Sequence, residues 1–187
     1  MVPVKIKRLH PDAVIPQYAT AGSAGFDLVA VEDVAISPGE TKKVPLGLAF
    51  EIPEGYVMLV CMRSGIAYNT ELRQSNGIGI IDSDYRGEVA MMFDNIWKKE
   101  PFFAYDEEGR AIVIEDECPS TEYLRTISGE QVRQWRDYPA GTYLIRKGDR
   151  VAQGLILPVM QAQFIVVDEL SETERGAGGF GSTGVSA

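Results

Sequence analysis

The stretch NGIGIIDSDYRGE, residues 76–88, combines a glycine-punctuated apolar run with a cluster of carboxylates, an aromatic residue and an arginine. The run is too short for a helix and rich in β-branched isoleucine, which favours a β-hairpin arm or two abutting strands joined by a polar turn. Asp82 follows this run directly, so it is a candidate general base at the edge of a cleft where water is scarce. The alternative interpretation is an Asp-Ser-Asp turn that only closes the hairpin.

Other short apolar segments on both sides of this stretch predict further strands. They lie at residues 4–9, 43–50, 56–62, 89–93, 142–145, 151–159 and 163–167. Alternating charged and apolar residues in 4–9 predict an edge strand, while the Pro and Gly within 43–50 predict an edge or a bulge. Because turns rich in proline and glycine separate the segments and no long helical period intervenes, the sequence predicts an all-β sandwich or barrel.

The composition excludes several classes of protein. The 187 residues suffice for one domain with a single core, and no apolar run approaches the roughly 18 residues that cross a bilayer. A formal charge of -9 argues against direct nucleic-acid binding and against an anionic membrane surface. The first residues, MVPVK, are not followed by the apolar core of a signal peptide, so we expect an intracellular, cytoplasmic protein.

Histidine and cysteine chemistry is excluded as well. His10, the single histidine, precedes Pro11 in a predicted loop, so there is no second imidazole for a Ser-His pair or a multi-histidine metal site. Cys61 and Cys118 show neither a CxxC spacing nor a disulfide framework. Hydrolytic chemistry therefore has to depend on carboxylates, arginines and a metal that the substrate carries.

Two further segments carry groups suited to phosphates. Arg63-Ser64-Gly65 follows a predicted buried strand and offers a forked cation, a hydroxyl and a free backbone amide, although many turns contain these residues by chance. The C-terminal stretch RGAGGFGSTG, residues 175–184, cannot build a core and should be mobile until a ligand orders it. Its amides, arginine and hydroxyls suit a polyphosphate, and Phe180 offers a flat face for a base.

The segment from residue 98 to 140 differs from its surroundings. It is acidic, and its apolar alternation is weaker than that of the flanking segments. Residues 128–131, SGEQ, fit a capping box that opens a short helix with Val132 and Trp135 on one face. We therefore expect a small helical or hairpin insertion on the main body.

Five stretches together resemble the dUTP pyrophosphatase (dUTPase) family. They are AGFDL at 24–28, RSG at 63–65, residues 76–88, GDRVAQ at 148–153 and RGAGGFGSTG at 175–184. The resemblance implies a jelly-roll or β-barrel-like subunit in a homotrimer, with active sites at subunit junctions that are each closed by a neighbour's C-terminal tail. It also implies a β core over 1–97 and 141–170, an insertion over 98–140, and an active-site arm over 171–187.

The resemblance further implies the reaction. In the family, the aspartate that matches Asp82 activates the water that attacks the α-phosphorus of dUTP, which releases dUMP and pyrophosphate. This reaction limits uracil in DNA and supplies dUMP for dTMP synthesis. The residue matching Tyr85 packs on the deoxyribose, and the hairpin matching Asn76 with Gly79, Ile80 and Ile81 reads uracil largely through its main chain.

The remaining functional positions also follow from the resemblance. Asp27 matches a residue that holds the waters of an Mg²⁺ ion, which is bound mainly by the triphosphate. The ring of Phe180 matches the one that covers uracil. Two further sets match phosphate contacts, the first from the core and the second from the arm: Arg63, Ser64, Gly65 and Gln153, and Arg175, Gly181, Ser182 and Thr183.

Two departures and two alternatives accompany this interpretation. Met62 stands where the family usually has proline, and Tyr68 stands near a position that is often basic. The insertion looks like the extra module of some phage-encoded dUTPases, which in some cases binds a regulatory protein, so a regulatory partner is one alternative role. The other alternative is a dCTP deaminase-like nucleotide enzyme of the same fold superfamily.

Overall fold

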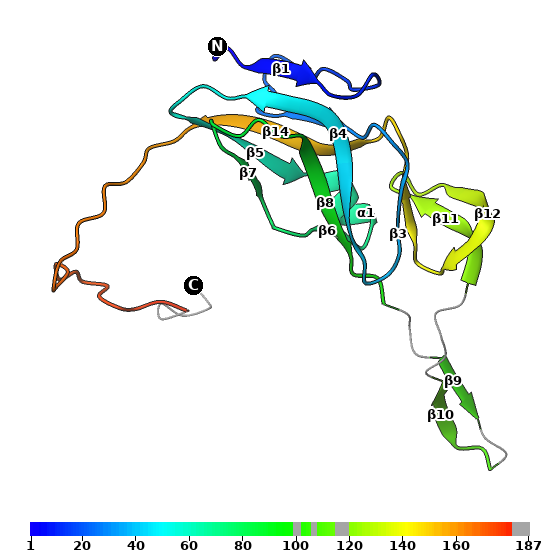
Figure 1. Cartoon of the computed structure of the whole chain (residues 1–187). Coiled ribbons are helices and arrows are strands. Elements are labelled where there is room, and N and C mark those ends of the chain that lie inside the picture. The colour runs from blue at the N-terminus through cyan, green and yellow to red at the C-terminus, as the bar shows by residue number, and fades with distance from the viewer. Residues whose placement is uncertain (99–101, 106–107, 115–119, 181–187) are drawn as a thin grey trace.

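Two four-stranded sheets form the body of the protein. The computed structural model describes residues 1–98, 102–105, 108–114 and 120–180. One sheet has the order β1-β4-β8-β6: Lys5–Arg8, Thr41–Glu51, Val89–Asn95 and Leu72–Gln74. The other has the order β2-β14-β5-β7: Phe26–Val29, Arg150–Pro158, Tyr56–Met62 and Gly79–Ile81. All the pairs in both sheets are antiparallel, and the two sheets form adjacent layers (Figure 1).

The core lies between these two sheets and follows from the period of two along each strand. In β8, Val89, Met91 and Phe93 are buried and alternate with partly exposed residues, and in β5 the buried positions are Met58 and Val60. Successive strand residues point to opposite faces, so each sheet turns one apolar face to its neighbour. The predicted all-β fold is therefore confirmed.

Strand β4 shows why its Pro and Gly are tolerated. Its register with β8 shifts between Pro45 and Leu48, and Gly47 adopts a φ of 64° at that shift. Of the two alternatives predicted for residues 43–50, the bulge is confirmed. The edge position is wrong, because β4 lies between β1 and β8. A side chain at Gly47 would meet His10 and Val31, so both the backbone angle and the space require glycine. β1 is an edge strand of this sheet, as predicted.

A third sheet has the order β12-β11-β13-β3: Gln131–Pro139, Ser120–Thr126, Tyr143–Ile145 and Val34–Ile36. The prediction that a helix begins at Ser128 is wrong, because residues 127–130 form the turn of the β11–β12 hairpin. Gly129 has a φ of 91° there, and Thr126 N donates to Glu130 O at 2.8 Å. Strands β9 and β10, Phe102–Tyr105 and Ala111–Ile114, pair with each other and project away from the body (Figure 1).

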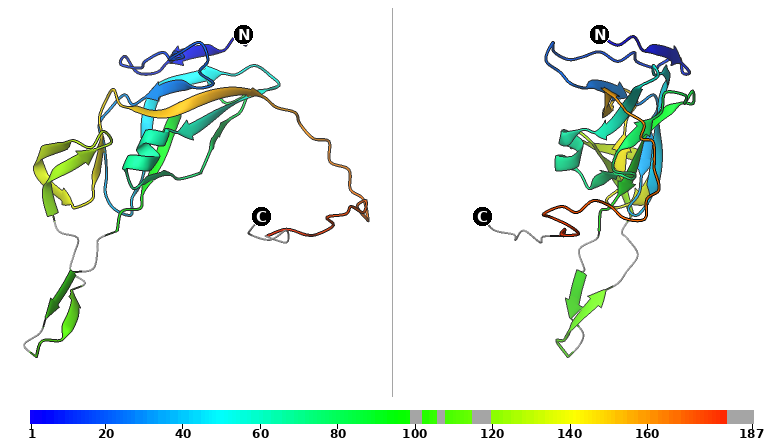
Figure 2. Two further views of the ribbon diagram at one scale, coloured as in Figure 1. Left: turned by 180° about the vertical axis from the view of Figure 1, so that it is seen from behind. Right: turned by 90° about the vertical axis from the view of Figure 1, so that its left-hand side faces the viewer.

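The C-terminal segment leaves the body after β14 and extends away from it in both views of Figure 2. Residues 163–167 were predicted to be a strand, and this prediction is wrong for the single chain: the segment pairs with no described strand. Phe164 and Val166 are 92% and 98% exposed. A strand needs a partner for its backbone groups, and within one copy this segment has none among the described residues.

The helix α1, Ser64–Asn69, links β5 to β6 and is anchored by the buried side chain of Ile66. It spans six residues, and none of the helices in the described part of the chain has the length and hydropathy to cross a membrane.

Candidate active site

Asp82 emerges at the end of β7. The strand pairs with β5 through Gly79, Ile80 and Ile81, and Asp82 follows as the first residue beyond the ladder. Its side chain is exposed at a cavity of about 1040 Å³ that is also lined by the β4–β5 turn and by Arg86. Among the described ion pairs none involves Asp82. The turn interpretation is confirmed, because Tyr85 N donates to Asp82 O at 3.2 Å, and the role of Asp82 as a general base stays a prediction.

Tyr85 is held in place by the loop that follows Asp82. Its hydroxyl donates to Glu88 O at 3.1 Å, and its ring lies so close to Gly87 that any added Cβ would overlap it. Glu88 in turn accepts a hydrogen bond from Gly47 N at 2.9 Å, which ties the loop to the bulge of β4. The half-exposed ring of Tyr85 is thus a fixed wall next to the catalytic candidate.

The hairpin before β7 presents backbone groups. Gly77 has a φ of 70°, and Ile78 N donates to Asn76 O at 2.7 Å, which makes a tight turn. Gln74 spans this turn, donating to Val60 O at 2.9 Å and to Asn76 Oδ1 at 3.3 Å. At Gly79 an added Cβ would lie 3.0 Å from the Cβ of Val60, which is tighter than an ordinary contact. The turn is therefore rigid while its outer residues stay exposed.

A second group of predicted residues clusters around Asp27. Arg63 Nε lies 3.1 Å from Asp27 Oδ1, and Arg150 Nη1 donates to Asp27 Oδ2 at 3.1 Å. Arg63 also donates to Arg150 O at 3.2 Å. Gln153 pairs in register with Asp27 on one side and with Cys61 on the other, so the three side chains share one face of the sheet. Sequence reasoning missed Arg150 as a member of this group, although it lies within the stretch GDRVAQ.

The two groups are separated within one chain. Gln153 lies beside Cys61, whereas Asp82 leaves the sheet beside Val57. These positions are four residues apart along β5, which corresponds to about 13 Å. The cavity at Asp82 is not lined by Arg63, Gln153 or Asp27. A single copy therefore brings together Asp82 with Tyr85, and Asp27 with Arg63 and Gln153, but not the two groups with each other.

The Asp27 group can support a metal ion but does not form a metal cage. The described residues contain no cluster of three or more His, Cys, Asp or Glu that could hold one. Asp27 Oδ1 is buried and accepts no hydrogen bond, because Arg63 Nε is close to it but poorly aligned. That oxygen can accept a hydrogen bond from water. This fits a Mg²⁺ ion held mainly by phosphate oxygens and waters, the ligands that Mg²⁺ usually keeps.

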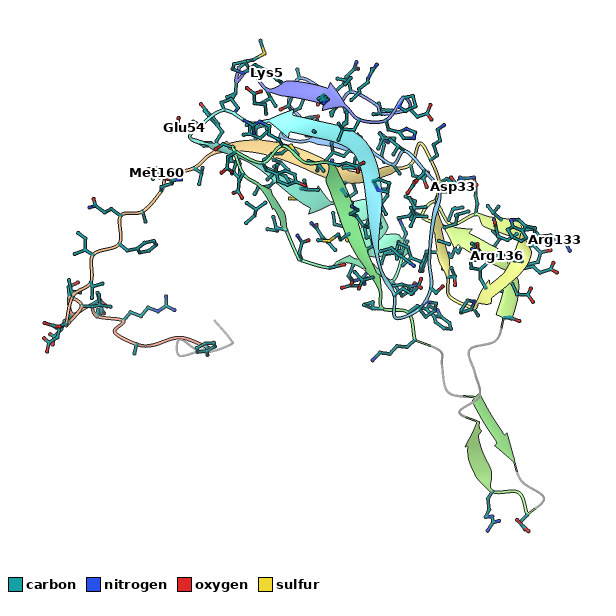
Figure 3. All side chains as sticks on the ribbon, in the orientation of Figure 1. Lys5, Asp33, Glu54, Arg133, Arg136 and Met160 are labelled. Carbon is teal, nitrogen blue, oxygen red and sulfur yellow. The ribbon has the colours of Figure 1, made fainter. Side chains whose placement is uncertain are left out.

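The described predicted residues of the C-terminal arm, Arg175 and Phe180, do not line the cavity at Asp82. The arm starts beside the β4–β5 turn, where Val159 N donates to Gly55 O at 2.9 Å and where Glu54 and Met160 are labelled in Figure 3. Arg175 Nε donates to Gly178 O at 2.7 Å, and Phe180 is fully exposed with a φ of 49°. Gly181, Ser182 and Thr183 lie outside the described residues.

Comparison with known sequences finds one family across most of the chain. The family model for dUTPase matches residues 12–108 and 140–184. A deoxyuridine 5'-triphosphate nucleotidohydrolase of Nautilia profundicola is 40% identical over 181 residues, which cover 97% of this chain and 98% of the relative. The enzyme of that name from Helicobacter pylori strain P12 is 35% identical over 183 residues, 98% of this chain and 97% of the relative.

Solved structures show the same likeness. The dUTPase of Staphylococcus bacteriophage 80alpha with dUPNHPP has a TM-score of 0.81 and 32% identity, and the match covers 98% of this chain and 99% of that one. That protein is described as controlling the transfer of virulence genes by a G protein-like mechanism. A variant dUTPase from phage phi11 of S. aureus, described as coordinating a structural Mg(II) ion, has a TM-score of 0.73 and 28% identity, covering 89% of this chain and 97% of that one.

Proposed function

The chain belongs to the dUTPase family, and we propose that Asp82 is the base in its reaction. Its fold is the jelly-roll-like dUTPase fold, and its activity is the hydrolysis of dUTP to dUMP and pyrophosphate. The observation that carries the role of Asp82 is its position, because β7 delivers an unpaired carboxylate to the rim of a large cavity. The action on a free nucleotide suits a cytoplasmic enzyme.

Asp82 acts on a water molecule. The carboxylate accepts one proton from the water as the water oxygen forms a bond to the α-phosphorus. The bond between that phosphorus and the oxygen bridging to the β-phosphorus breaks in line, and pyrophosphate leaves with the bridging oxygen. An arginine pair such as Arg63 and Arg150 offsets the charge of the phosphates. Asp27 would hold the waters of a Mg²⁺ ion, and that ion would supply further charge neutralisation at the triphosphate.

Selectivity rests on the rigid loops on either side of Asp82. The turn at Asn76 offers backbone donors and acceptors to uracil, so cytosine, with its exocyclic amine, would leave polar groups unpaired. The wall formed by Tyr85 supports rejection of a 2′-hydroxyl group, since the ring cannot retreat from Gly87 and Glu88 without losing its hydrogen bond. Phe180 on the arm supplies the aromatic surface that covers the base.

The active site is assembled from several copies of the chain in a homotrimer. The division into two groups supports this: the positions beside Gln153 and beside Asp82 are offset by about 13 Å along β5, and none of Asp27, Arg63 and Gln153 lines the cavity at Asp82, although one nucleotide has to contact both groups. The outward face of the second sheet also carries Leu59, Leu155 and the 64%-exposed Ile80 in one row across neighbouring strands. An apolar row of this kind is stabilised when another copy covers it. The arm leads away from its own body and can reach a neighbour.

Substrate profiling tests the function. Pyrophosphate release should be fast with dUTP and slow with dCTP, dTTP and UTP, and Asp82→Asn should abolish most of it while nucleotide affinity is kept. Ammonia release from dCTP without activity on dUTP would instead identify the dCTP deaminase-like alternative.

A regulatory role of the insertion is a second candidate. The β9–β10 hairpin pairs only with itself among the described strands, and the β11–β12 hairpin carries the 89%-exposed Trp135 with Arg136 stacked 5.6 Å from its ring centre. Arg133 and Arg136 project outward from β12 in Figure 3. Exposed Trp and Arg are typical of protein-binding hot spots. Deleting the insertion, residues 98–140, should leave turnover nearly intact and remove binding of a regulatory protein; lost turnover in an intact trimer would place the insertion in the active site.

A further inference from the structure

Tyr143 places a hydroxyl group deep in the protein. The residue lies in β13 and is 2% exposed, and its hydroxyl donates to the carboxylate of Glu71. The same hydroxyl accepts a hydrogen bond from Glu71 N at 3.3 Å. Burial raises the pKa of Tyr143, and the hydrogen bond to Glu71 raises it further, so the phenol remains a donor at neutral pH.

Glu71 stands at the end of the segment that carries the predicted phosphate-binding triplet. Arg63 directly precedes α1, Ser64 and Gly65 begin it, and Glu71 follows the cap residue Thr70. Glu71 O accepts a hydrogen bond from Ile96 N at 3.0 Å, while the Thr70 hydroxyl donates to Ile66 O at 2.7 Å. Ile66 anchors this segment in the core, and the hydrogen bonds between Glu71 and Tyr143 tie it to the third sheet.

Tyr143 itself is firmly placed. Its strand lies between β11 and β3, with Tyr143 opposite Arg125 on one side and Ile36 on the other. The buried amide of Asn95 donates to Gly141 O and to Ile36 O, at 2.9 Å each, which fixes the entry to β13. The hydroxyl of Tyr143 is therefore a fixed point against which α1 can be set.

We propose that Tyr143 and Glu71 are positioning residues for dUTP hydrolysis, which hold α1 so that the Arg63-Ser64-Gly65 triplet meets the phosphates in a fixed geometry. The proposal rests on the proposed function, since it assigns the task of the pair at that same phosphate site. Neither residue touches the reacting atoms, and neither belongs to the five stretches that resemble the family. The two hydrogen bonds between Glu71 and Tyr143 are part-buried, and a hydrogen bond to an ionised carboxylate is about twice as strong as one between neutral groups, so the pair can fix such a short helix.

The experiment compares four single variants and one double variant of the full chain by steady-state kinetics with dUTP and by thermal melting. Tyr143→Phe removes only the hydroxyl, Glu71→Ala removes the acceptor, and Glu71→Gln keeps an acceptor oxygen. Tyr123→Phe is the matched control, because it makes the same chemical change at a half-exposed tyrosine on the adjacent strand β11.

We expect Tyr143→Phe and Glu71→Ala each to raise KM on the order of 5-fold while kcat stays within about 2-fold, because the triplet binds phosphates before and during the reaction. Glu71→Gln should have a KM near that of the natural chain, and Tyr123→Phe should not change KM. The double variant Tyr143→Phe/Glu71→Ala should raise KM little more than either single variant does. Should Tyr143→Phe lower only the melting temperature, or should Glu71→Gln raise KM as much as Glu71→Ala, the pair is merely structural and the proposal is overturned.

Failure of this proposal is distinguishable from failure of the proposed function. If the chain hydrolyses dUTP and Asp82→Asn abolishes this activity, the proposed function is supported. If Tyr143→Phe then leaves KM unchanged, only the positioning role of Tyr143 and Glu71 is wrong. Should Tyr143→Phe fail to fold, the comparison of Glu71→Ala with Glu71→Gln decides the question alone.

Discussion

Arg63 Nε lies 3.1 Å from Asp27 Oδ1, which joins the residue after β5 to the second residue of β2 across the intervening strand β14. Arg150 approaches the other oxygen of the same carboxylate at 3.1 Å. One acid thus holds two arginines on the face that carries Gln153. Because the Asp27 side chain is 19% exposed, this arrangement is less screened by solvent than an ordinary surface pair.

Asp27→Asn should therefore weaken the binding of the triphosphate. The amide keeps the shape of the side chain but loses the charge that holds Arg63 and Arg150, so we expect kcat/KM for dUTP to fall about 10-fold. Asp33→Asn is the control, because Asp33 accepts a backbone hydrogen bond from Lys147, whereas the ion pairs of Arg63 and Arg150 are with Asp27. Equal losses from the two variants would contradict a specific role of Asp27.

Gly87→Ala should relax the selectivity for deoxyribose. The new methyl group would overlap the Tyr85 ring and force it from the position in which its hydroxyl bonds Glu88 O. We expect the ratio of kcat/KM for dUTP over UTP to fall about 10-fold, because the wall against a 2′-hydroxyl moves. Gly22→Ala, where an added Cβ meets nothing within 4 Å, should leave the ratio unchanged. An unaltered ratio in Gly87→Ala would show that another group excludes UTP.

Asp94 should contribute to stability in a pH-dependent way. Hydrogen bonds from the hydroxyls of Ser75 and Thr41, at 2.7 and 2.6 Å, lower the pKa of Asp94 below its ordinary value of 3.8. A carboxyl whose pKa is lower in the folded state stabilises the fold above the unfolded pKa and loses this contribution as pH falls through the folded pKa. Thermal melts from pH 7 down to pH 3 should therefore show a shallower loss in Asp94→Asn than in the natural chain. Parallel curves would contradict the role of these hydrogen bonds.

Removing residues 175–187 should impair catalysis without affecting the core. The described part of this segment bonds only to itself and to Thr173, so its loss removes no core contact. We expect kcat/KM to fall on the order of 100-fold while the melting temperature is unchanged, since a closing arm excludes water and completes the phosphate site. Truncation of residues 185–187 alone serves as the control. If the chain without residues 175–187 has the same kcat/KM for dUTP as the full chain, the arm is not a lid.

The strands of the core could be predicted because their residues alternate with the period of a half-buried sheet, as in Val89, Met91 and Phe93. The turn at Ser128 was misjudged because SGEQ satisfies a capping box as well as a hairpin turn, and only the backbone at Gly129, with its positive φ, separates the two. The apolar residues 163–167 look like a strand in sequence, but a strand's partner can come from another copy, which local patterning does not reveal.

The sequence predicts the residues of the candidate site, but it does not predict that they form two separate groups within one chain. The stretches that contain Asp82 and Arg63 could be identified from their residue types and order. Their separation depends on the register of β7 and β14 against β5, which places Asp82 next to Val57 and Gln153 next to Cys61. Strand registers are set by pairing across the whole sheet and cannot be predicted from one segment alone. The sequence therefore does not show which site residues lie close together within one chain. Tyr143 and Glu71 carried no sequence signal at all.

The central claim is that each active site combines Asp82 of one copy with Arg63 of another. The most direct test mixes Asp82→Asn and Arg63→Ala chains in equal amounts, folds them together, and measures dUTP hydrolysis of the assembled trimers. If the two residues come from different copies, about a quarter of the sites contain both natural residues, and that share of the activity should return. If mixed trimers form and remain as inactive as the two parent variants, the site lies within one chain and the account is contradicted.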